Sequence, residues 1–187
     1  MKRTVLLLSG LLQKEVERLE QHFKVIRLER NKAPETVLEA HARDIVAVIS
    51  APWSPVGAHL IDALPNLEII CQSGIGLDNI DLTHAASRGI VVTNTPDIVT
   101  DDTADIAFAL ILTLLRRIVE ADMFVRVGKW RNGPMGLGSS LSGKTVGILG
   151  MGRIGRAVAT RAEAFGMDVI YTSRGQKTDL GYKFYTT

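Results

Sequence analysis

The amino-acid sequence predicts an α/β protein whose sheets are built from parallel strands. Two observations support this prediction. Short apolar segments of strand length alternate with segments of helical periodicity over the first ninety-odd residues, which is typical of a parallel sheet covered by helices. Nearer the C-terminus, an apolar segment runs into a glycine-rich turn, a helical segment and a second apolar segment. The composition is ordinary for a globular protein, with 46% hydrophobic and 22% charged residues.

The first ninety-odd residues are expected to form one compact α/β unit. The expected strands are 4–8, 24–28, 45–50, 67–72 and 90–93. The expected helices are 13–22, 33–42, 57–64 and 82–88. Because a helix separates each strand from the next, consecutive strands are expected to run in the same direction.

A long helix is expected after a connection at residues 94–100. It runs to about residue 127, with Thr100 or Asp101 as its N-cap. Its first half is apolar on nearly all sides, which predicts burial between two bodies. A glycine-rich loop over residues 128–142 follows.

The next segment has the spacing G-x-G-x-x-G, formed by Gly150, Gly152 and Gly155. It follows a predicted strand at 145–149 and precedes a predicted helix at 156–165 and a second strand at 168–172. In such a unit the first glycine allows a tight turn, the second lets the backbone approach a pyrophosphate, and the third lets helix and strand pack closely. The pattern predicts a Rossmann-type dinucleotide-binding turn. An ordinary glycine turn is the alternative.

The polar residues 174–187 are not expected to add a strand. The nucleotide-binding part would then hold two strands and one helix, whereas a complete domain has two βαβαβ halves. An apolar strand edge would be left uncovered. The chain is therefore expected to be part of a longer protein.

Charge and cysteine content exclude several classes of function. The net charge of +2 and the absence of a basic run argue against nucleic acid. Cys71 is the only cysteine, which suits a reducing, cytoplasmic compartment. Residues 4–12 imitate a secretory signal but lack a cleavage site, and the apolar run 106–115 is too short to span a membrane. The sequence shows no Cys/His cluster with metal-binding spacing.

Several segments together resemble the D-isomer-specific 2-hydroxyacid dehydrogenases, especially the glyoxylate/hydroxypyruvate reductase branch. The matching segments are 72–81 (QSGIGLDNID), 93–97 (TNTPD), 100–105 (TDDTAD) and 141–155 (LSGKTVGILGMGRIG). The resemblance implies a flavodoxin-like substrate domain over 1–97, an interdomain helix over 98–128 and an incomplete Rossmann-type coenzyme domain over 129–187. It also implies a homodimer formed through the coenzyme domain and the 100–128 helix.

The resemblance assigns roles to individual residues. Ser73, Gly74, Ile75 and Gly76 match the loop whose backbone amides hold the substrate carboxylate. Small residues favour such an anion-binding nest, although a plain turn after a strand is the alternative. Thr103 matches a position near the nicotinamide, and Arg153 and Ile154 match positions at the pyrophosphate. The alternatives are a plain first-turn residue for Thr103 and a solvated charge for Arg153.

The end of the second strand predicts the coenzyme. NAD-binding proteins usually have an Asp or Glu there, whereas this chain has Ser173 and Arg174. A serine can hydrogen-bond a 2′-phosphate and an arginine can pair with it. We therefore expect NADP(H) rather than NAD(H).

The catalytic residues are expected beyond residue 187. The family uses an Arg, a Glu and a His, and none of them can be placed here. His22, His41, His59 and His84 are all expected to have surface or packing roles. The resemblance implies NAD(P)H-dependent reduction of a small 2-oxo acid such as glyoxylate or hydroxypyruvate to a D-2-hydroxy acid, with these 187 residues inactive alone. The alternative is a non-enzymatic, nucleotide-sensing protein similar to the transcriptional corepressors of this fold.

Overall fold

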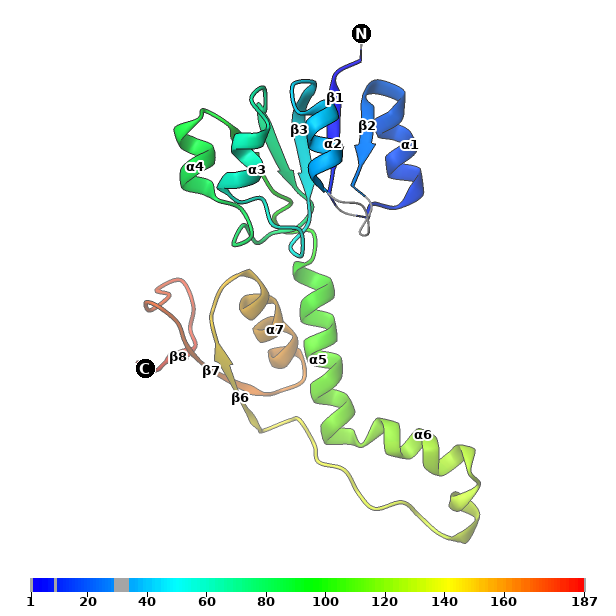
Figure 1. Ribbon diagram of the computed structural model, residues 1–187. Helices are drawn as coiled ribbons and strands as arrows, with labels where there is room; N and C mark the ends of the chain where they lie inside the picture. Colours follow the sequence, from blue (N-terminus) through cyan, green and yellow to red (C-terminus); the bar gives the residue numbers. More distant parts are fainter. Residues whose placement is uncertain (1, 9, 29–33, 187) are drawn as a thin grey trace. The chain divides into compact units, whose positions relative to one another are not determined.

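The computed structural model describes residues 2–8, 10–28 and 34–186 (Figure 1). The chain divides into two compact units, Met1–Pro96 and Asp97–Thr187. Each unit contains a parallel sheet flanked by helices, so the predicted fold class is confirmed. No helix among the described residues is both long and apolar enough to cross a bilayer.

The first unit is built on a five-stranded parallel sheet in the order β2-β1-β3-β4-β5, which is the flavodoxin-like order. Its strands are β1 (Thr4–Leu7), β2 (Lys24–Arg27), β3 (Ile45–Ser50), β4 (Ile69–Gln72) and β5 (Val91–Thr93). Its helices are α1 (Gln13–His22), α2 (Pro34–His41), α3 (Ala58–Ala63) and α4 (Leu82–Ser87). The predicted elements are all present, with ends within two residues of the prediction. Residue 33, the expected start of α2, lies outside the described residues.

Apolar side chains from the central strands make the core of this unit. Leu6 of β1, Val48 of β3 and Ile70 of β4 are fully buried. Ile61 of α3 and Ala85 of α4 are buried in the same cluster. Strands covered on both faces lose the alternation of polar and apolar residues, which explains why β1 and β3 read as continuous apolar runs.

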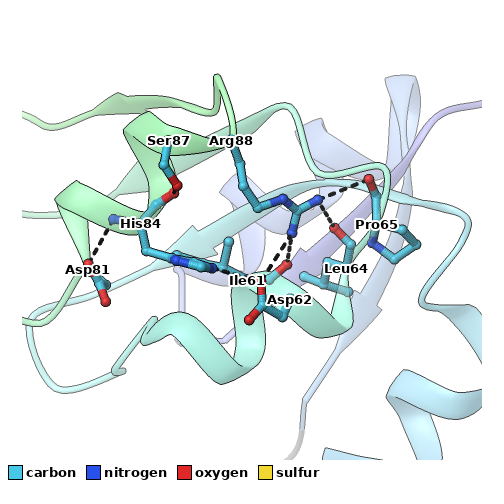
Figure 2. Close-up of polar contacts among 8 residues, drawn as sticks. All are labelled: Ile61, Asp62, Leu64, Pro65, Asp81, His84, Ser87 and Arg88. Atoms are coloured by element: carbon cyan, nitrogen blue, oxygen red, sulfur yellow. Dashed lines mark hydrogen bonds and ion pairs between the residues drawn. The ribbon is translucent and has the colours of Figure 1, made fainter.

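Arg88, just after α4, fastens α4 to the end of α3 (Figure 2). Its guanidinium donates to the carbonyl of Ile61, and to those of Leu64 at 3.2 Å and Pro65 at 3.0 Å. The Ile61 and Leu64 carbonyls also accept backbone N–H groups, those of Leu64 and Leu67, each at 3.2 Å. Arg88 therefore adds a second, charge-assisted hydrogen bond to each of these two oxygens.

A second set of polar contacts supports the same joint (Figure 2). Nε2 of His84 lies 2.7 Å from Oδ1 of Asp62, which joins α4 to α3. Asp81 caps α4 by accepting the His84 N–H at 2.9 Å, and the Ser87 hydroxyl donates to the His84 carbonyl at 2.7 Å. These contacts give His84 the packing role expected from the sequence.

The second unit contains a three-stranded parallel sheet in the order β6-β7-β8. Its strands are β6 (Thr145–Leu149), β7 (Asp168–Thr172) and β8 (Lys183–Phe184). Its helices are α5 (Thr100–Arg116), α6 (Ile118–Arg126), the short 3-10 helix η1 (Lys129–Asn132) and α7 (Arg153–Ala164). Phe108 of α5 packs on Phe165 after α7, with ring centroids 4.9 Å apart. Arg161 of α7 also pairs with Asp101 and Asp105 of α5.

The single helix expected over 100–127 is two helices, because the chain turns at Arg117 with a left-handed φ of 56°. The Leu115 carbonyl accepts the Ser139 N–H at 2.8 Å in place of a bond that would continue the helix. A Cβ at Gly138 would lie 2.7 Å from that oxygen, so only glycine allows this approach.

The expected capping of α5 by Thr100 or Asp101 is also wrong. The N-cap is Val99, and no side chain caps the helix. Instead, the Thr100 N–H donates to the Asp97 carbonyl at 3.2 Å. Asp97 has a left-handed φ of 69°, and α5 begins at Thr100 with a backbone bond in place of a side-chain cap.

One stripe of α5 is buried and another is exposed. Ala104 and Phe108 are buried, whereas Ile106, Leu110 and Leu114 are exposed. Within this unit α5 is buried on one face, and the expected burial between two bodies stays a prediction.

The expectation that residues 174–187 add no strand is wrong. β8 extends the sheet beyond β7, and Phe184 packs on Tyr171 with ring centroids 5.3 Å apart. Asp179, in the connection to β8, accepts two bonds from the Arg156 guanidinium at 2.6 and 3.1 Å. The hydrogen bond from Arg156 lowers the pKa of Asp179. The segment is mostly polar, but three of its apolar residues pack against the core of the second unit: Leu180, Tyr182 and Phe184.

We expect Arg88→Met to destabilise the first unit by about 1–2 kcal/mol, because the carbonyls of Ile61, Leu64 and Pro65 each lose a charge-assisted hydrogen bond. Arg18→Met is the matched control, since Arg18 is exposed and pairs only with Glu15 among the described residues. That control should change stability by less than about 0.5 kcal/mol. Amide hydrogen exchange in β3 and β4 measures both effects. Equal effects of the two substitutions would show that the Arg88 contacts contribute nothing beyond a surface pair.

Candidate functional site

The loop after β4, formed by Ser73, Gly74, Ile75 and Gly76, is anchored through its carbonyl groups. The Gly74 carbonyl accepts the Thr95 N–H at 3.0 Å. The Ile75 carbonyl accepts from Nδ2 of Asn94 at 2.8 Å, and the Gly76 carbonyl accepts from Nε2 of Gln72 at 3.0 Å. Three consecutive carbonyls are therefore held by three separate donors.

The amide groups of the same loop are free to meet a ligand. The Ser73 N–H donates to the Ser50 carbonyl at 2.8 Å, which continues the pairing of β4 with β3. Within the described part of the chain, the N–H groups of Gly74, Ile75 and Gly76 have no acceptor. A Cβ at Gly74 would lie 2.9 Å from Cγ of Pro52, so the loop needs glycine there. Free consecutive amides suit an anion, and the role of this loop in binding a carboxylate stays a prediction.

In the second unit, β6 and α7 form the glycine turn. Gly150 has a left-handed φ of 101°, and its N–H donates to the Thr172 carbonyl at 2.9 Å. Gly152 is the N-cap of α7, and a Cβ there would meet no atom within 4 Å. A Cβ at Gly155 would lie 2.2 Å from the Gly150 carbonyl oxygen. Gly155 therefore allows the close packing of helix on strand, and Gly152 leaves open space.

This open space fits a phosphate group. The first N–H groups of a helix lack intrahelical acceptors, and the helix dipole places partial positive charge at the same end. The first backbone bond of α7 is from the Arg156 N–H to the Gly152 carbonyl at 2.9 Å. A pyrophosphate could approach the amides before it without meeting a side chain at Gly152.

Arg153 has a partner that sequence reasoning missed. Its Nε lies 2.7 Å from Oδ1 of Asp97, and both side chains are exposed. The sequence predicted that the Arg153 guanidinium contacts a phosphate or is solvated. In the structure it forms an ion pair within the second unit. Ile154, beside it in the first turn of α7, is also exposed. The left-handed φ of Asp97 is the feature that brings its carboxylate to this turn, and spacing along the sequence carries no signal for it.

Ser173 and Arg174 leave the sheet at the same edge as the glycine turn. Thr172 at the end of β7 is paired in register with Leu149 at the end of β6, so the following residues lie next to Gly150. The Ser173 hydroxyl donates to the Gly175 carbonyl at 2.7 Å. Arg174 is exposed and forms no ion pair with the residues that the structure describes.

Thr103 is the remaining candidate from the sequence. Thr103 is exposed in the first turn of α5, where its N–H donates to the Val99 carbonyl at 3.0 Å. No group of acidic, histidine or cysteine side chains in the described ranges could hold a metal ion. Sequence reasoning also missed Gln72 and Asn94, whose amides hold the carbonyls of the Ser73–Gly76 loop. A buried glutamine at a strand end was the available signal for the first of them.

We expect Gly155→Ala to destabilise the second unit by about 1–3 kcal/mol, because the new methyl group would overlap the Gly150 carbonyl oxygen. Gly152→Ala is the matched control, because its methyl group meets no neighbour and its φ of −88° suits any residue. The control should cost less than about 1 kcal/mol. Thermal unfolding followed by circular dichroism compares the two variants. A cost for Gly152→Ala equal to that for Gly155→Ala would contradict the packing role of Gly155.

Known proteins share this arrangement. The chain is 48% identical over 169 residues to a glyoxylate/hydroxypyruvate reductase of Arabidopsis thaliana. The matched region covers 90% of this chain and 54% of the relative. A 2-hydroxyacid dehydrogenase from Ketogulonicigenium vulgare superimposes with a TM-score of 0.95 at 34% identity, covering 100% of this chain and 59% of that one. An NADPH-dependent glyoxylate/hydroxypyruvate reductase from Sinorhizobium meliloti, solved with NADP and malonate, has a TM-score of 0.84 at 38% identity and covers 99% and 57% of the two chains.

The chain spans about half the length of the curated relatives that it matches. Residues 5–186 match the D-isomer specific 2-hydroxyacid dehydrogenase, catalytic domain. The sequence resemblance to this family is thereby confirmed, and its members use NAD(P). With its two parallel sheets, its anchored loop after β4 and its glycine turn after β6, the chain belongs to the D-isomer specific 2-hydroxyacid dehydrogenase family.

Proposed function

We propose that this chain forms the carboxylate-binding and coenzyme-binding parts of an NADPH-dependent reductase of small 2-oxo acids. The substrate would be glyoxylate, hydroxypyruvate or a similar acid, and the product a D-2-hydroxy acid. The first unit would be the substrate domain and the second the coenzyme domain. The observation that carries this proposal is that each unit offers free backbone amides at the carboxyl ends of its parallel strands, as an anionic substrate and an anionic coenzyme require.

The loop Ser73–Gly76 would hold the substrate carboxylate. Its free amides can donate to both oxygens, and the protein then needs no charged side chain to bind the anion. A fixed carboxylate orients the neighbouring carbonyl carbon for reduction, which lowers the entropic part of the barrier. The nicotinamide supplies the hydride when the coenzyme is bound.

The glycine turn would hold the coenzyme pyrophosphate at the first turn of α7, with Arg153 and Ile154 beside it. Thr103 would lie near the nicotinamide, as the family resemblance implies. Arg153 would exchange its exposed pair with Asp97 for a phosphate oxygen, since an exposed ion pair contributes little free energy.

Three observations support NADP(H) over NAD(H). The end of β7 carries no carboxylate, because Ser173 and Arg174 follow Thr172 directly. Arg174 is exposed at this sheet edge and could pair with a 2′-phosphate. The relative from Sinorhizobium meliloti is NADPH-dependent.

We expect this chain to bind NADPH at least about tenfold more tightly than NADH, because a charge-assisted pair with the 2′-phosphate adds about 1.4 kcal/mol. Arg174→Ala should remove most of that difference and leave NADH affinity unchanged. Arg126→Ala is the control, since Arg126 lies in α6 and pairs with Asp122. Titration of coenzyme fluorescence measures the affinity of each of the three proteins for NADPH and for NADH. NADH binding as tight as NADPH binding in the unaltered chain would refute the preference.

We also propose that a second copy of the chain covers the exposed stripe of α5, giving a homodimer. Ile106, Leu110 and Leu114 recur at i+4 spacing and are all exposed, which is unusual for large apolar side chains unless a partner covers them.

The double substitution Leu110→Glu with Leu114→Glu should weaken dimerisation at least about tenfold, because charges do not desolvate easily at an apolar contact. Lys14→Glu is the control, since it makes the same change in net charge at an exposed position of α1, in the first unit, and should leave the dimer intact. Sedimentation velocity separates monomer from dimer. A chain that is monomeric without any substitution would contradict the proposed dimer.

A further inference from the structure

A buried path of polar side chains connects the end of β3 to the loop after β4. Ser50 is fully buried and Gln72 is 2% exposed. The Ser50 hydroxyl donates to Oε1 of Gln72. Nε2 of Gln72 donates to the Gly76 carbonyl at 3.0 Å and to Oδ1 of Asn79 at 2.9 Å. Both the oxygen and the nitrogen of the Gln72 amide therefore have hydrogen-bond partners, as a buried amide requires.

Asn79 determines which end of the Gln72 amide faces the loop. Nδ2 of Asn79 donates to the carbonyls of Ala51 at 3.0 Å and Ser54 at 2.8 Å. Its Oδ1 must then be the acceptor toward Gln72, so Gln72 presents Nε2 on that side. The same Nε2 reaches the Gly76 carbonyl. The connected hydrogen bonds thus make Nε2 of Gln72 the donor to the loop carbonyl.

A held carbonyl also directs the next N–H. In a trans peptide the carbonyl of one residue and the N–H of the next point in opposite directions. Asn94 holds the Ile75 carbonyl, so the Gly76 N–H points away from Asn94. Gln72 holds the Gly76 carbonyl, so the Leu77 N–H points away from Gln72. The Leu77 N–H has no acceptor in the described ranges either.

We propose that Gln72 and Asn94 are positioning residues that aim the amides of Gly76 and Leu77 at the substrate carboxylate. The proposal rests on the proposed function of the Ser73–Gly76 loop and extends its amide cradle to Leu77. Neither side chain touches the substrate. Each acts by holding one carbonyl so that the N–H on the other side of the same peptide faces the anion. A loop without these two donors would sample other peptide orientations and lose its preorganisation.

Malonate is a suitable probe, because a relative from Sinorhizobium meliloti was solved with it. Amide chemical shifts of the isotopically labelled chain report directly on the N–H groups that meet the anion. In the unaltered chain, titration with malonate should shift the Gly76 and Leu77 amides. Gln72→Met keeps the shape of the side chain without a donor, and Asn94→Ala removes the other donor.

Each substitution should weaken malonate binding about tenfold, the effect of losing about 1.4 kcal/mol. Gln72→Met should lose mainly the Leu77 shift, and Asn94→Ala mainly the Gly76 shift. Asn66→Ala is the matched control, since Nδ2 of Asn66 also donates to a carbonyl, that of Arg43 at 2.7 Å, elsewhere in the first unit. The control should bind malonate as the unaltered chain does. A merely structural role would lower stability without moving single amide shifts.

The outcomes separate this proposal from the proposed function. If malonate moves none of the loop amides in the unaltered chain, the carboxylate-binding role falls and this inference falls with it. If the unaltered chain responds but both variants bind malonate equally well, positioning by Gln72 and Asn94 is refuted and the loop keeps its role. Asn94 is half-buried, so Asn94→Ala should fold and decide the matter even if Gln72→Met does not.

Discussion

Hydrogen-bond donors that hold the backbone carbonyls of the loop after β4 shape the candidate site of the first unit. At the carboxyl end of a parallel sheet, the chain leaves the ladder and its peptide groups lose their strand partners. In the first unit, Thr95, Asn94 and Gln72 supply donors to three consecutive carbonyls of the loop after β4. Each peptide is rigid and trans, so its C=O and N–H point in opposite directions. A donor that binds the carbonyl on one side of the peptide therefore leaves the N–H on the opposite side free. The proposed binding of an anion by the loop rests on this arrangement.

The second unit obtains free amides by a different route. There the start of α7 supplies them, and close packing sets their position. Gly155 lies so near the Gly150 carbonyl oxygen that no side chain could be added, whereas Gly152 faces open space. Arg161 and Phe108 then hold α7 against α5. The turn is therefore supported by the packing of two helices that are far apart in the sequence.

Local pattern predicted most elements of both units. Continuous apolar runs identified β1 and β3, and glycine spacing identified the turn before α7. The failures occurred where a distant contact decided the local structure. The Ser139 N–H donates to the Leu115 carbonyl at the end of α5. Arg156 binds Asp179 in the connection that leads to β8. No window of neighbouring residues contains either pair, so periodicity could not reveal them.

The sequence by itself determined the parallel α/β architecture and the glycine turn, because apolar periodicity and the special backbone freedom of glycine act locally. The family came from the resemblance of four segments to known members. Only the tertiary structure decided how the site residues are held. In the folded chain Arg153 pairs with Asp97, and the side-chain amides of Gln72 and Asn94 donate to the loop carbonyls. These outcomes depend on where strand ends and turns meet in space. Hydrogen bonds are short and directional, so they are settled only once the sheets have formed.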